Sequence, residues 1–141
     1  MHHLIYLSQA TRPLSAKALT NLVEQARQAN ARQCLTGALV YSNKRFIQLL
    51  EGEQAALEAA YMHISQDPRH QHLCKVAHRP IAARYFSESP LAFQTLSPAQ
   101  FAHLAGYLAP TKSGQHFPAY GSVATSFIEA MRALVQAPVA N

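Results

Sequence analysis

The stretch Phe46-Ile47-Gln48-Leu49-Leu50-Glu51-Gly52 is the most apolar run of the chain, and it predicts a buried strand that ends at Gly52. Side chains alternate between the two faces of a strand, so Gln48 shares a face with Phe46 and Leu50. A buried amide costs roughly 1–3 kcal/mol unless its hydrogen bonds are met. We therefore expect either the protein or a bound polar ligand to supply a partner for Gln48.

Strands and helices alternate on both sides of this stretch. Apolar runs predict strands over residues 4–8, 35–41, 45–51 and 75–81, and a shorter strand from residue 84 into the nineties, which Pro90 weakens. One amphipathic helix is expected from the N-cap Ser15 to about Ala29, and a second around residues 57–64 ends at Asp67-Pro68. The order β-α-β-β-α-β, with one more strand, predicts an α+β, ferredoxin-like fold in which two helices cover one face of an antiparallel sheet.

The last third of the chain predicts two further helices. Ser97-Pro98 is a helix start, a loop is expected over residues 110–118, and a last helix over residues 122–136. That helix carries an apolar stripe, called the C-terminal stripe below: Phe127, Ile128, Met131, Leu134 and Val135. We expect these helices to cover the other sheet face or the surface of a partner, which gives a domain over 1–95 and a C-terminal helical extension over 96–141.

Composition narrows the class of protein. The chain has 141 residues, 49% hydrophobic and 13% charged, as expected of one globular domain. Its formal net charge of +5 suits a phosphate-bearing ligand or an acidic partner. The basic residues are scattered, so the sequence does not predict nucleic-acid binding.

Cysteine content and hydropathy suggest a compartment. Cys34 and Cys74 are the only cysteines, as expected in a reduced cytoplasm, and Cys34 opens an apolar run in which we expect it to be buried. We see neither a signal peptide nor a stretch of the ~18 apolar residues that a membrane span requires. A soluble, cytoplasmic protein is expected.

Several polar side chains converge on one place in the predicted fold. Tyr6 and Gln48 lie on different strands, Asn30 ends the first helix, and Asp67-Pro68-Arg69-His70 closes the second. Both helices lie over the same sheet face, so a slot between them would have a sheet floor and helical walls. The set of phenol, amides, imidazole and guanidinium suits a heteroaromatic ring with a phosphate tail nearby.

Each of these residues also has a purely structural interpretation. Tyr6 suits a core, Gln48 could bond a neighbouring strand, Asn30 could be a helix C-cap, and Glu51 could face solvent. His70 and His72 would form an exposed pair, and with no third ligand evident no metal site is expected. Two other classes of function stay open. One is a small ferredoxin-like enzyme using Tyr6, Glu51 or His70 as acid-base groups, and the other is an interaction module without a ligand.

Taken together and in order, these segments resemble BLUF domains, the blue-light sensors that use a flavin, over about residues 3–93. The matching segments are Leu4-Ile5-Tyr6-Leu7-Ser8, Asn30, Leu35-Thr36-Gly37-Ala38-Leu39, Phe46-Ile47-Gln48-Leu49-Leu50-Glu51-Gly52 and Asp67-Pro68-Arg69-His70. The resemblance implies a receptor rather than an enzyme, with FAD bound non-covalently and FMN possible because both share the ring.

The resemblance also implies roles for individual residues. Tyr6 would give an electron and then a proton to the excited flavin, the proton passing by way of Gln48, and Gln48 would be left rearranged by rotation or tautomerisation. Its new hydrogen bond would shift the flavin absorption to the red. Asn30 would bond the polar edge of the ring and Phe46 would wall it. Arg69 and His70 would lie near the ring and its side chain.

The chain departs from the family in two respects. Ser89-Pro90-Leu91 stands where BLUF domains often carry Trp-x-Met, so Ser89 and Leu91 are candidate signal-strand positions at which Leu91 offers packing only. The chain has no tryptophan, which makes Tyr6 the expected sole productive donor. His63 stands where some relatives place an arginine toward the phosphate. The resemblance implies that output passes through a partner protein or a homo-oligomer, with the C-terminal stripe as the candidate surface.

Overall fold

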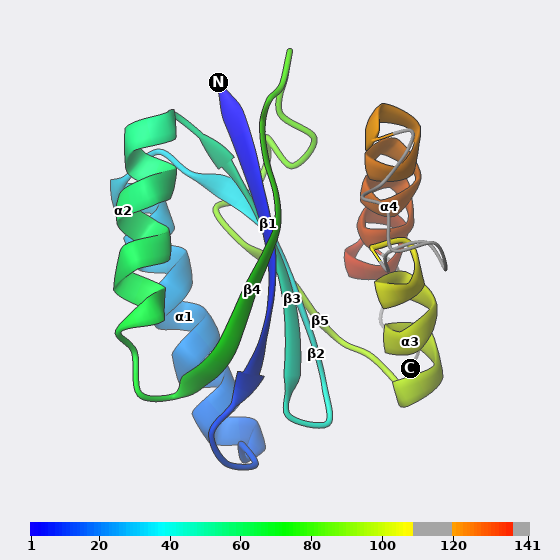
Figure 1. The fold of residues 1–141 in the computed structure, drawn as a ribbon. Coiled ribbons are helices and arrows are strands. Elements are labelled where there is room, and N and C mark those ends of the chain that lie inside the picture. Colours follow the sequence, from blue (N-terminus) through cyan, green and yellow to red (C-terminus); the bar gives the residue numbers. More distant parts are fainter. Residues whose placement is uncertain (109–119, 137–141) are drawn as a thin grey trace.

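The protein is described by a computed structural model over residues 1–108 and 120–136, in which a five-stranded sheet lies between two pairs of helices (Figure 1). The strands are β1 (His2–Ala10), β2 (Thr36–Ser42), β3 (Arg45–Gly52), β4 (His70–Pro80) and β5 (Ala92–Thr95). The helices are α1 (Ala16–Arg32), α2 (Gln54–Ser65), α3 (Pro98–Gly106) and α4 (Tyr120–Val135). The loop expected over 110–118 lies outside the described residues. The predicted ferredoxin-like order, with two helices on one face and two C-terminal helices, is confirmed.

The sheet order is β4-β1-β3-β2-β5, and it corrects the expectation of a wholly antiparallel sheet. β5 pairs with β2 in the parallel direction, and it begins at Ala92, after Pro90, rather than near residue 84. β4 begins at His70, five residues earlier than expected. It lies at the sheet edge, where its many solvent-facing residues give no clean alternation for sequence reasoning to detect.

The turn between β2 and β3 fixes the register of the central hairpin. Asn43 and Lys44 both have left-handed backbones, with φ of 47° and 71°. Two consecutive residues of this kind make a turn whose twist matches that of antiparallel strands. The hairpin predicted around residues 42–44 is therefore confirmed, and it pairs Leu39 with Gln48.

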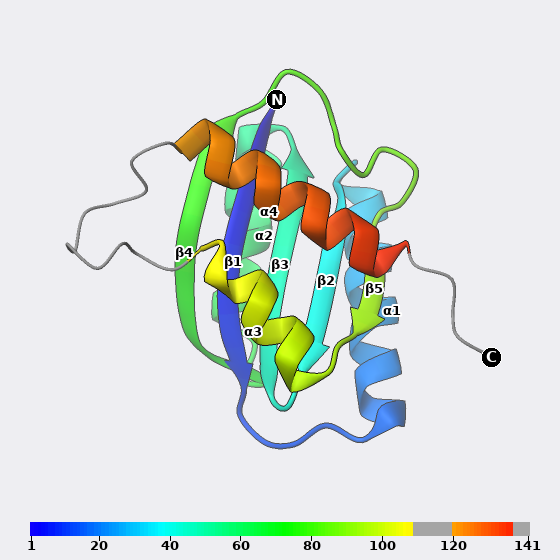
Figure 2. The ribbon, with the colours of Figure 1, turned by 90° about the vertical axis from the view of Figure 1, so that its right-hand side faces the viewer.

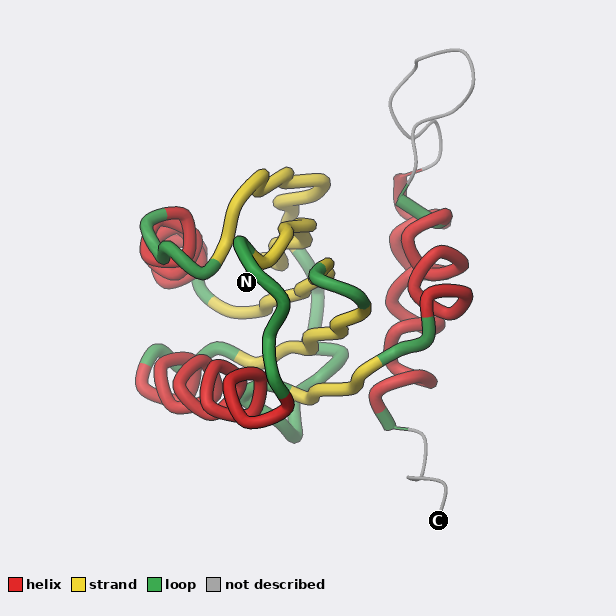
Figure 3. The backbone as a smooth tube through the Cα atoms, turned by 90° about the horizontal axis from the view of Figure 1, so that it is seen from below, coloured by secondary structure: helices red, strands yellow, loops and turns green. Residues whose placement is uncertain are grey.

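Strand alternation divides β3 between two cores. Phe46 packs with residues of α1 and Leu50 with residues of α2, whereas Ile47 and Leu49 belong to the cluster that includes α3 and α4. Figure 3 shows the two helix pairs on opposite sides of the strands. Gln48 therefore lies on the α1/α2 face, as the alternation predicted.

The C-terminal helices cover the opposite face of the sheet (Figure 2). α3 begins with the capping box that Ser97 and Gln100 form, directly before an N-terminal proline. In the C-terminal stripe, which lies on α4, Phe127, Ile128 and Met131 are at most 2% exposed, because they pack into the cluster with the sheet. The stripe was expected to cover either the sheet or the surface of a partner, and the structure places it on the sheet.

The solvent exposure of two residues differs from the prediction. Cys34 is exposed, because it follows the C-cap of α1 as a left-handed residue with φ of 57° and does not enter the strand. Glu51 is fully buried rather than facing solvent, for reasons given with the site. No helix within residues 1–108 and 120–136 is both long and apolar enough to cross a membrane.

Acid is expected to destabilise the fold through His3, which is buried in β1. Burial, followed by the positive charges of Arg79, His78 and His2, lowers the pKa of His3 from the ordinary histidine value of 6.5 to about 4. The unfolded chain therefore binds a proton at higher pH than the folded chain does. The free energy of unfolding should fall as the pH drops from 6.5 towards 4, by up to about 3 kcal/mol in total.

Denaturant titrations across this pH range measure the effect. His3→Gln keeps a polar side chain that cannot titrate, so its unfolding free energy should depend less steeply on pH. The remaining slope would include His70 and His78, whose pKa values are also lowered by burial. An equally steep dependence in His3→Gln would contradict the assignment.

Candidate functional site

A cavity of about 400 Å³ lies between α1, α2 and the sheet. Strand residues form its floor, and the two helices form its walls. This volume falls within the range of about 300–1,000 Å³ that is typical of small-molecule sites. The lining residues are Tyr6, Leu22, Gln25, Ala26, Ala29, Asn30, Arg32, Gln33, Leu35, Leu39, Gln48, Ala59, Ala60, His63, Ile64, Asp67, Arg69 and His70.

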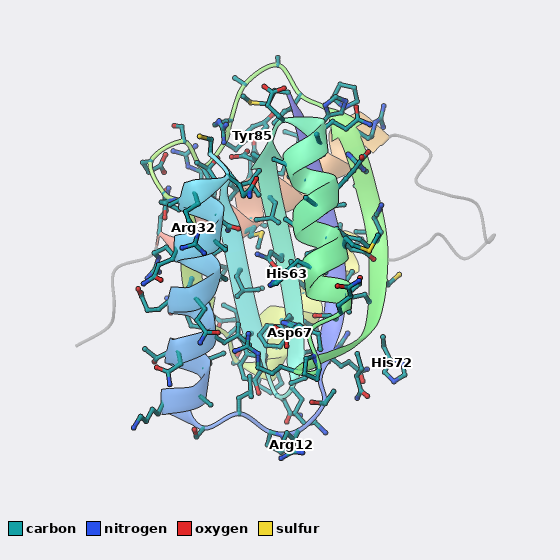
Figure 4. All side chains as sticks on the ribbon, turned by 90° about the vertical axis from the view of Figure 1, so that its left-hand side faces the viewer. Arg12, Arg32, His63, Asp67, His72 and Tyr85 are labelled. Atoms are coloured by element: carbon teal, nitrogen blue, oxygen red, sulfur yellow. The ribbon has the colours of Figure 1, made fainter. Side chains whose placement is uncertain are left out.

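The structure brings together five of the six side chains expected to bind the ligand: Tyr6, Asn30, Gln48, Arg69 and His70. The sixth, Phe46, is fully buried and does not line the cavity. It lies beneath His70, with 4.9 Å between the ring centroids, so it supports a lining residue. A view between α1 and α2 places His63 and Asp67 over this part of the sheet (Figure 4).

Tyr6 and Gln48 form a hydrogen-bonded pair at the cavity floor. They are cross-strand partners in the β1–β3 register, and the Tyr6 hydroxyl donates to Gln48 Oε1. Burial, together with Tyr61 and Asp67, raises the pKa of the Tyr6 phenol far above its usual range. The phenol therefore keeps its proton at ordinary pH and directs it to the amide of Gln48.

Gln48 lines the cavity, and one end of its amide is not bonded to Tyr6. Its Oε1 is engaged by Tyr6, whereas no hydrogen bond joins its Nε2 to any other residue of the described chain. An amide can donate at one end and accept at the other. Gln48 thus finds one partner in Tyr6, and its Nε2 is left as a donor for a ligand.

Asn30 supplies the complementary polar group from the helix wall. It lies within the last turn of α1, is 6% exposed, and its Nδ2 donates to the carbonyl of Pro90 at 3.0 Å. That bond leaves Oδ1 as an acceptor. The C-cap interpretation of Asn30 is wrong, because Gln33 occupies the cap position.

Arg69 lines the cavity and forms hydrogen bonds with two other lining residues, Asp67 and Gln25. Its guanidinium bonds the Asp67 carboxylate, with Nη2–Oδ2 at 2.7 Å, and its Nη1 donates to Gln25 of α1 at 3.0 Å. The hydrogen bonds from Arg69 lower the pKa of Asp67, although burial opposes the shift. With its donors engaged in this way, Arg69 joins the α2–β4 turn to α1.

His70 continues the same wall towards the sheet. Its Nδ1 lies 3.1 Å from Ser8 Oγ, and burial lowers its pKa, with Asp67 acting in the opposite direction. His70 is therefore a neutral, half-buried lining residue. We had expected His70 and His72 to be exposed together, but only His72 is exposed. No group of three metal-ligating side chains exists within residues 1–108 and 120–136.

The candidate signal-strand residues lie behind the cavity wall and do not line it. Leu91 is fully buried beside α1, and its carbonyl accepts from Arg27 Nε at 3.2 Å and Nη2 at 3.1 Å. The Ser89 carbonyl accepts from the backbone N–H of Gly37 at 3.3 Å. Together with the Asn30–Pro90 bond, these contacts tie three consecutive carbonyls to α1 and β2.

Glu51 belongs to the other face of the sheet. Its carboxylate accepts from the backbone N–H groups of Tyr85 and Phe86, at 2.6 and 3.0 Å, and from the Thr36 hydroxyl at 2.9 Å. These donors explain its complete burial and why residues 84–86 do not form a strand. Glu51 is therefore separated from Tyr6 and His70, and the three do not form a joint acid-base site.

Sequence reasoning missed the lining residues Gln25, Arg32 and Gln33 of α1. Gln25, Ala29 and Arg32 recur at helical spacing, and this spacing could have predicted that they face the same cavity. Arg32 and His63 contribute cationic or titratable groups from opposite helix walls (Figure 4). The arrangement can hold a flat ring with an apolar face and a polar edge, and a more polar tail along the helices.

The chain is similar in sequence to known proteins. The family model BLUF, described as sensors of blue light using FAD, matches residues 1–92. The photoactivated adenylate cyclase subunit beta of Euglena gracilis is 41% identical over 83 residues, which cover 59% of this chain and 10% of that protein. The blue light- and temperature-regulated antirepressor BluF of Escherichia coli K12 is 31% identical over 86 residues, 61% of this chain and 21% of that protein. The chain spans about a tenth of the length of the cyclase subunit.

Solved structures show the same fold over nearly the whole chain. The dark-state structure of BlrB, a BLUF protein, has a TM-score of 0.68 at 26% identity, covering 92% of this chain and 95% of that one. The photo-activated state of BlsA has a TM-score of 0.72 at 20% identity, covering 99% and 98%. The second likeness concerns the fold, and it includes the C-terminal helices.

Proposed function

Because the chain belongs to the BLUF family, the sensors of blue light using FAD, we propose that it is a blue-light receptor that binds a flavin non-covalently between α1 and α2. The observation that carries the proposal is the hydrogen bond from Tyr6 to Gln48 at the floor of the cavity. It places a phenol with a proton to give beside an amide that can accept it.

The lining residues fit a flavin by their chemistry. Leu22, Leu39 and Ile64 supply apolar walls for a flat ring, and Gln48 Nε2 and Asn30 Oδ1 supply a donor and an acceptor for its polar edge. A bound flavin would supply blue-light absorption and an excited state that takes up one electron. We propose FAD as the natural ligand, with FMN able to fill the same ring site.

In the proposed photoreaction Tyr6 loses an electron and then its phenol proton, which passes to Gln48 along the existing hydrogen bond. Return of the electron and the proton restores Tyr6. Gln48 is left rearranged, by rotation or by tautomerisation, because its amide has both a donor and an acceptor end. The new donor orientation is the proposed source of the red shift.

For output we propose a partner protein or a change in homo-oligomeric assembly, in the cytoplasm. The segment 89–91 supports a route from the cavity, since Asn30 bonds Pro90 and Arg27 bonds Leu91. Residue Tyr85, in the preceding loop, accepts a hydrogen bond from Arg132 of α4 at 2.9 Å. A displacement of this segment would therefore change the contact between Tyr85 and α4.

The direct test is the absorption spectrum of the purified protein, loaded with flavin if needed. We expect a yellow protein whose bands shift to the red under blue light and recover in the dark. Protein that cannot be loaded would refute flavin binding and would favour a ligand-free interaction module. Loaded protein with no shift would refute the photoreaction.

Asn30→Ala is expected to weaken flavin binding about tenfold, the equivalent of one hydrogen bond to a buried polar group. Titration of flavin fluorescence against the flavin-free protein measures the dissociation constant. Gln28→Ala is the matched control, because Gln28 is exposed on the same helix and does not line the cavity. Equal affinities of the two variants would contradict the role of Asn30.

A further inference from the structure

A second tyrosine contacts Tyr6. Tyr61 of α2 lies edge-to-face against it, with 5.5 Å between the ring centroids and 79° between the ring planes. Tyr61 is half-buried and does not line the cavity, so its contact with the site runs through Tyr6. The chain contains no tryptophan, which leaves Tyr61 as the oxidisable ring in contact with the proposed donor.

This contact would divert the proposed photoreaction. Once Tyr6 has lost an electron, one electron can pass from Tyr61 to Tyr6, which restores Tyr6 and leaves Tyr61 oxidised. The Tyr61 phenol, which is partly open to solvent, would then release its proton to water. A neutral radical would remain on Tyr61, and the electron given up by Tyr6 could no longer return to it along the original path.

The structure places a positive charge over Tyr61. Lys75 of β4 is the cross-strand partner of Tyr6, and its Nζ lies 4.7 Å from the centroid of the Tyr61 ring. An ammonium in this position is attracted by the electrons of a neutral ring. It would repel the positive charge that forms when the ring loses an electron.

We propose that Lys75 is a positioning residue for the photoreaction, whose ammonium over Tyr61 confines electron loss to Tyr6. The inference rests on the proposed function, in which Tyr6 is the donor. Lys75 acts through Tyr61 and touches neither the cavity nor Gln48. Its effect should depend on charge and be transmitted only while residue 61 can be oxidised.

The first test follows the radical in flavin-loaded protein under blue light. In Lys75→Met, which keeps an unbranched side chain one atom shorter and removes the charge, we expect ~5-fold more long-lived tyrosyl radical by electron paramagnetic resonance, and fewer molecules reaching the red-shifted state. Lys75→Arg keeps the charge and should behave as the native chain. Lys17→Met, at an exposed site on α1, controls for loss of a lysine elsewhere.

Adding Tyr61→Phe to Lys75→Met should return the radical to the native level, because phenylalanine is much harder to oxidise. A radical that persists in the double variant, or that is unchanged in Lys75→Met, would overturn the proposal. These measurements are interpreted only if the native protein, loaded with flavin, shows the red shift. Absence of that shift in the native chain is instead a failure of the proposed function.

The second test needs no flavin. A photogenerated one-electron oxidant is added to the flavin-free protein, and oxidation of each tyrosine is followed by peptide mass spectrometry. Tyr61 should be modified ~5-fold faster in Lys75→Met than in Lys75→Arg, whereas the exposed Tyr85 should be modified at equal rates in both. Equal rates at Tyr61 would overturn the protective role of Lys75 whatever the flavin-loaded protein does.

Discussion

Tyr6→Phe is expected to bind flavin and to show no red shift under blue light. The position is 1% exposed, and phenylalanine fills the same space in the cluster with Leu4 and Leu50. What is removed is the phenol, and with it both the proton directed at Gln48 and the easily oxidised ring. Difference absorption spectroscopy of the loaded variant before and after illumination measures the result.

The matched control is Tyr41→Phe. Tyr41 is also a buried strand tyrosine, in ring contact with Phe46, but it does not line the cavity, so its loss should leave the red shift intact. Gln48→Leu should also lose the shift, because the amide that rearranges is gone. A red shift of native size in Tyr6→Phe would show that another residue gives the electron, and Tyr61 would be the first to examine.

Removing the carboxylate of Glu51 is expected to destabilise the fold on the other face of the sheet. Glu51→Leu removes the acceptor of two backbone N–H groups and of the Thr36 hydroxyl. The bond from the Phe86 N–H is buried, whereas those from the Tyr85 N–H and the Thr36 hydroxyl are part-buried. A buried donor left without its acceptor costs about 1–3 kcal/mol and a part-buried donor costs less, so the free energy of unfolding should fall by about 2–4 kcal/mol. Chemical denaturation of the variant and the native chain gives this difference.

Glu51→Gln should cost less, since its amide oxygen can still accept from one or two of the three donors. Glu58→Gln is the control, because Glu58 is exposed on α2 and bonds only Gln54 among the described residues. A loss below about 0.5 kcal/mol in Glu51→Leu would contradict the role assigned to this carboxylate.

Much of the fold followed from local patterns. The alternation in residues 46–52 placed Gln48 on the side of Phe46 and Leu50, and the structure has all three there. Asn43 and Lys44 adopt the left-handed turn that a tight hairpin requires. The capping signal at Ser97-Pro98 begins α3 as predicted. In each case the deciding interaction is between residues close in sequence, or follows from the two-residue period of a strand.

Other features depend on partners far away in sequence. Glu51 is buried because it accepts hydrogen bonds from Tyr85 and Phe86, which are 34 and 35 residues away in sequence. The same bonds hold residues 85 and 86 outside a strand, and β5 begins only at Ala92. The strand β5 then pairs parallel with β2, which no pattern within residues 84–95 indicated. The sequence segment that misled prediction is thus the one fixed by long-range hydrogen bonds.

The sequence by itself determined the order of the elements, the face on which Gln48 lies and, through the family match over residues 1–92, the kind of ligand to expect. Only the tertiary structure decided which groups are left for that ligand. Arg69 is engaged by Asp67 and Gln25, Phe46 lies behind His70, and Lys75 is set over Tyr61. The physical reason is that periodicity places a side chain on a face, whereas its partners depend on which distant segments that face meets.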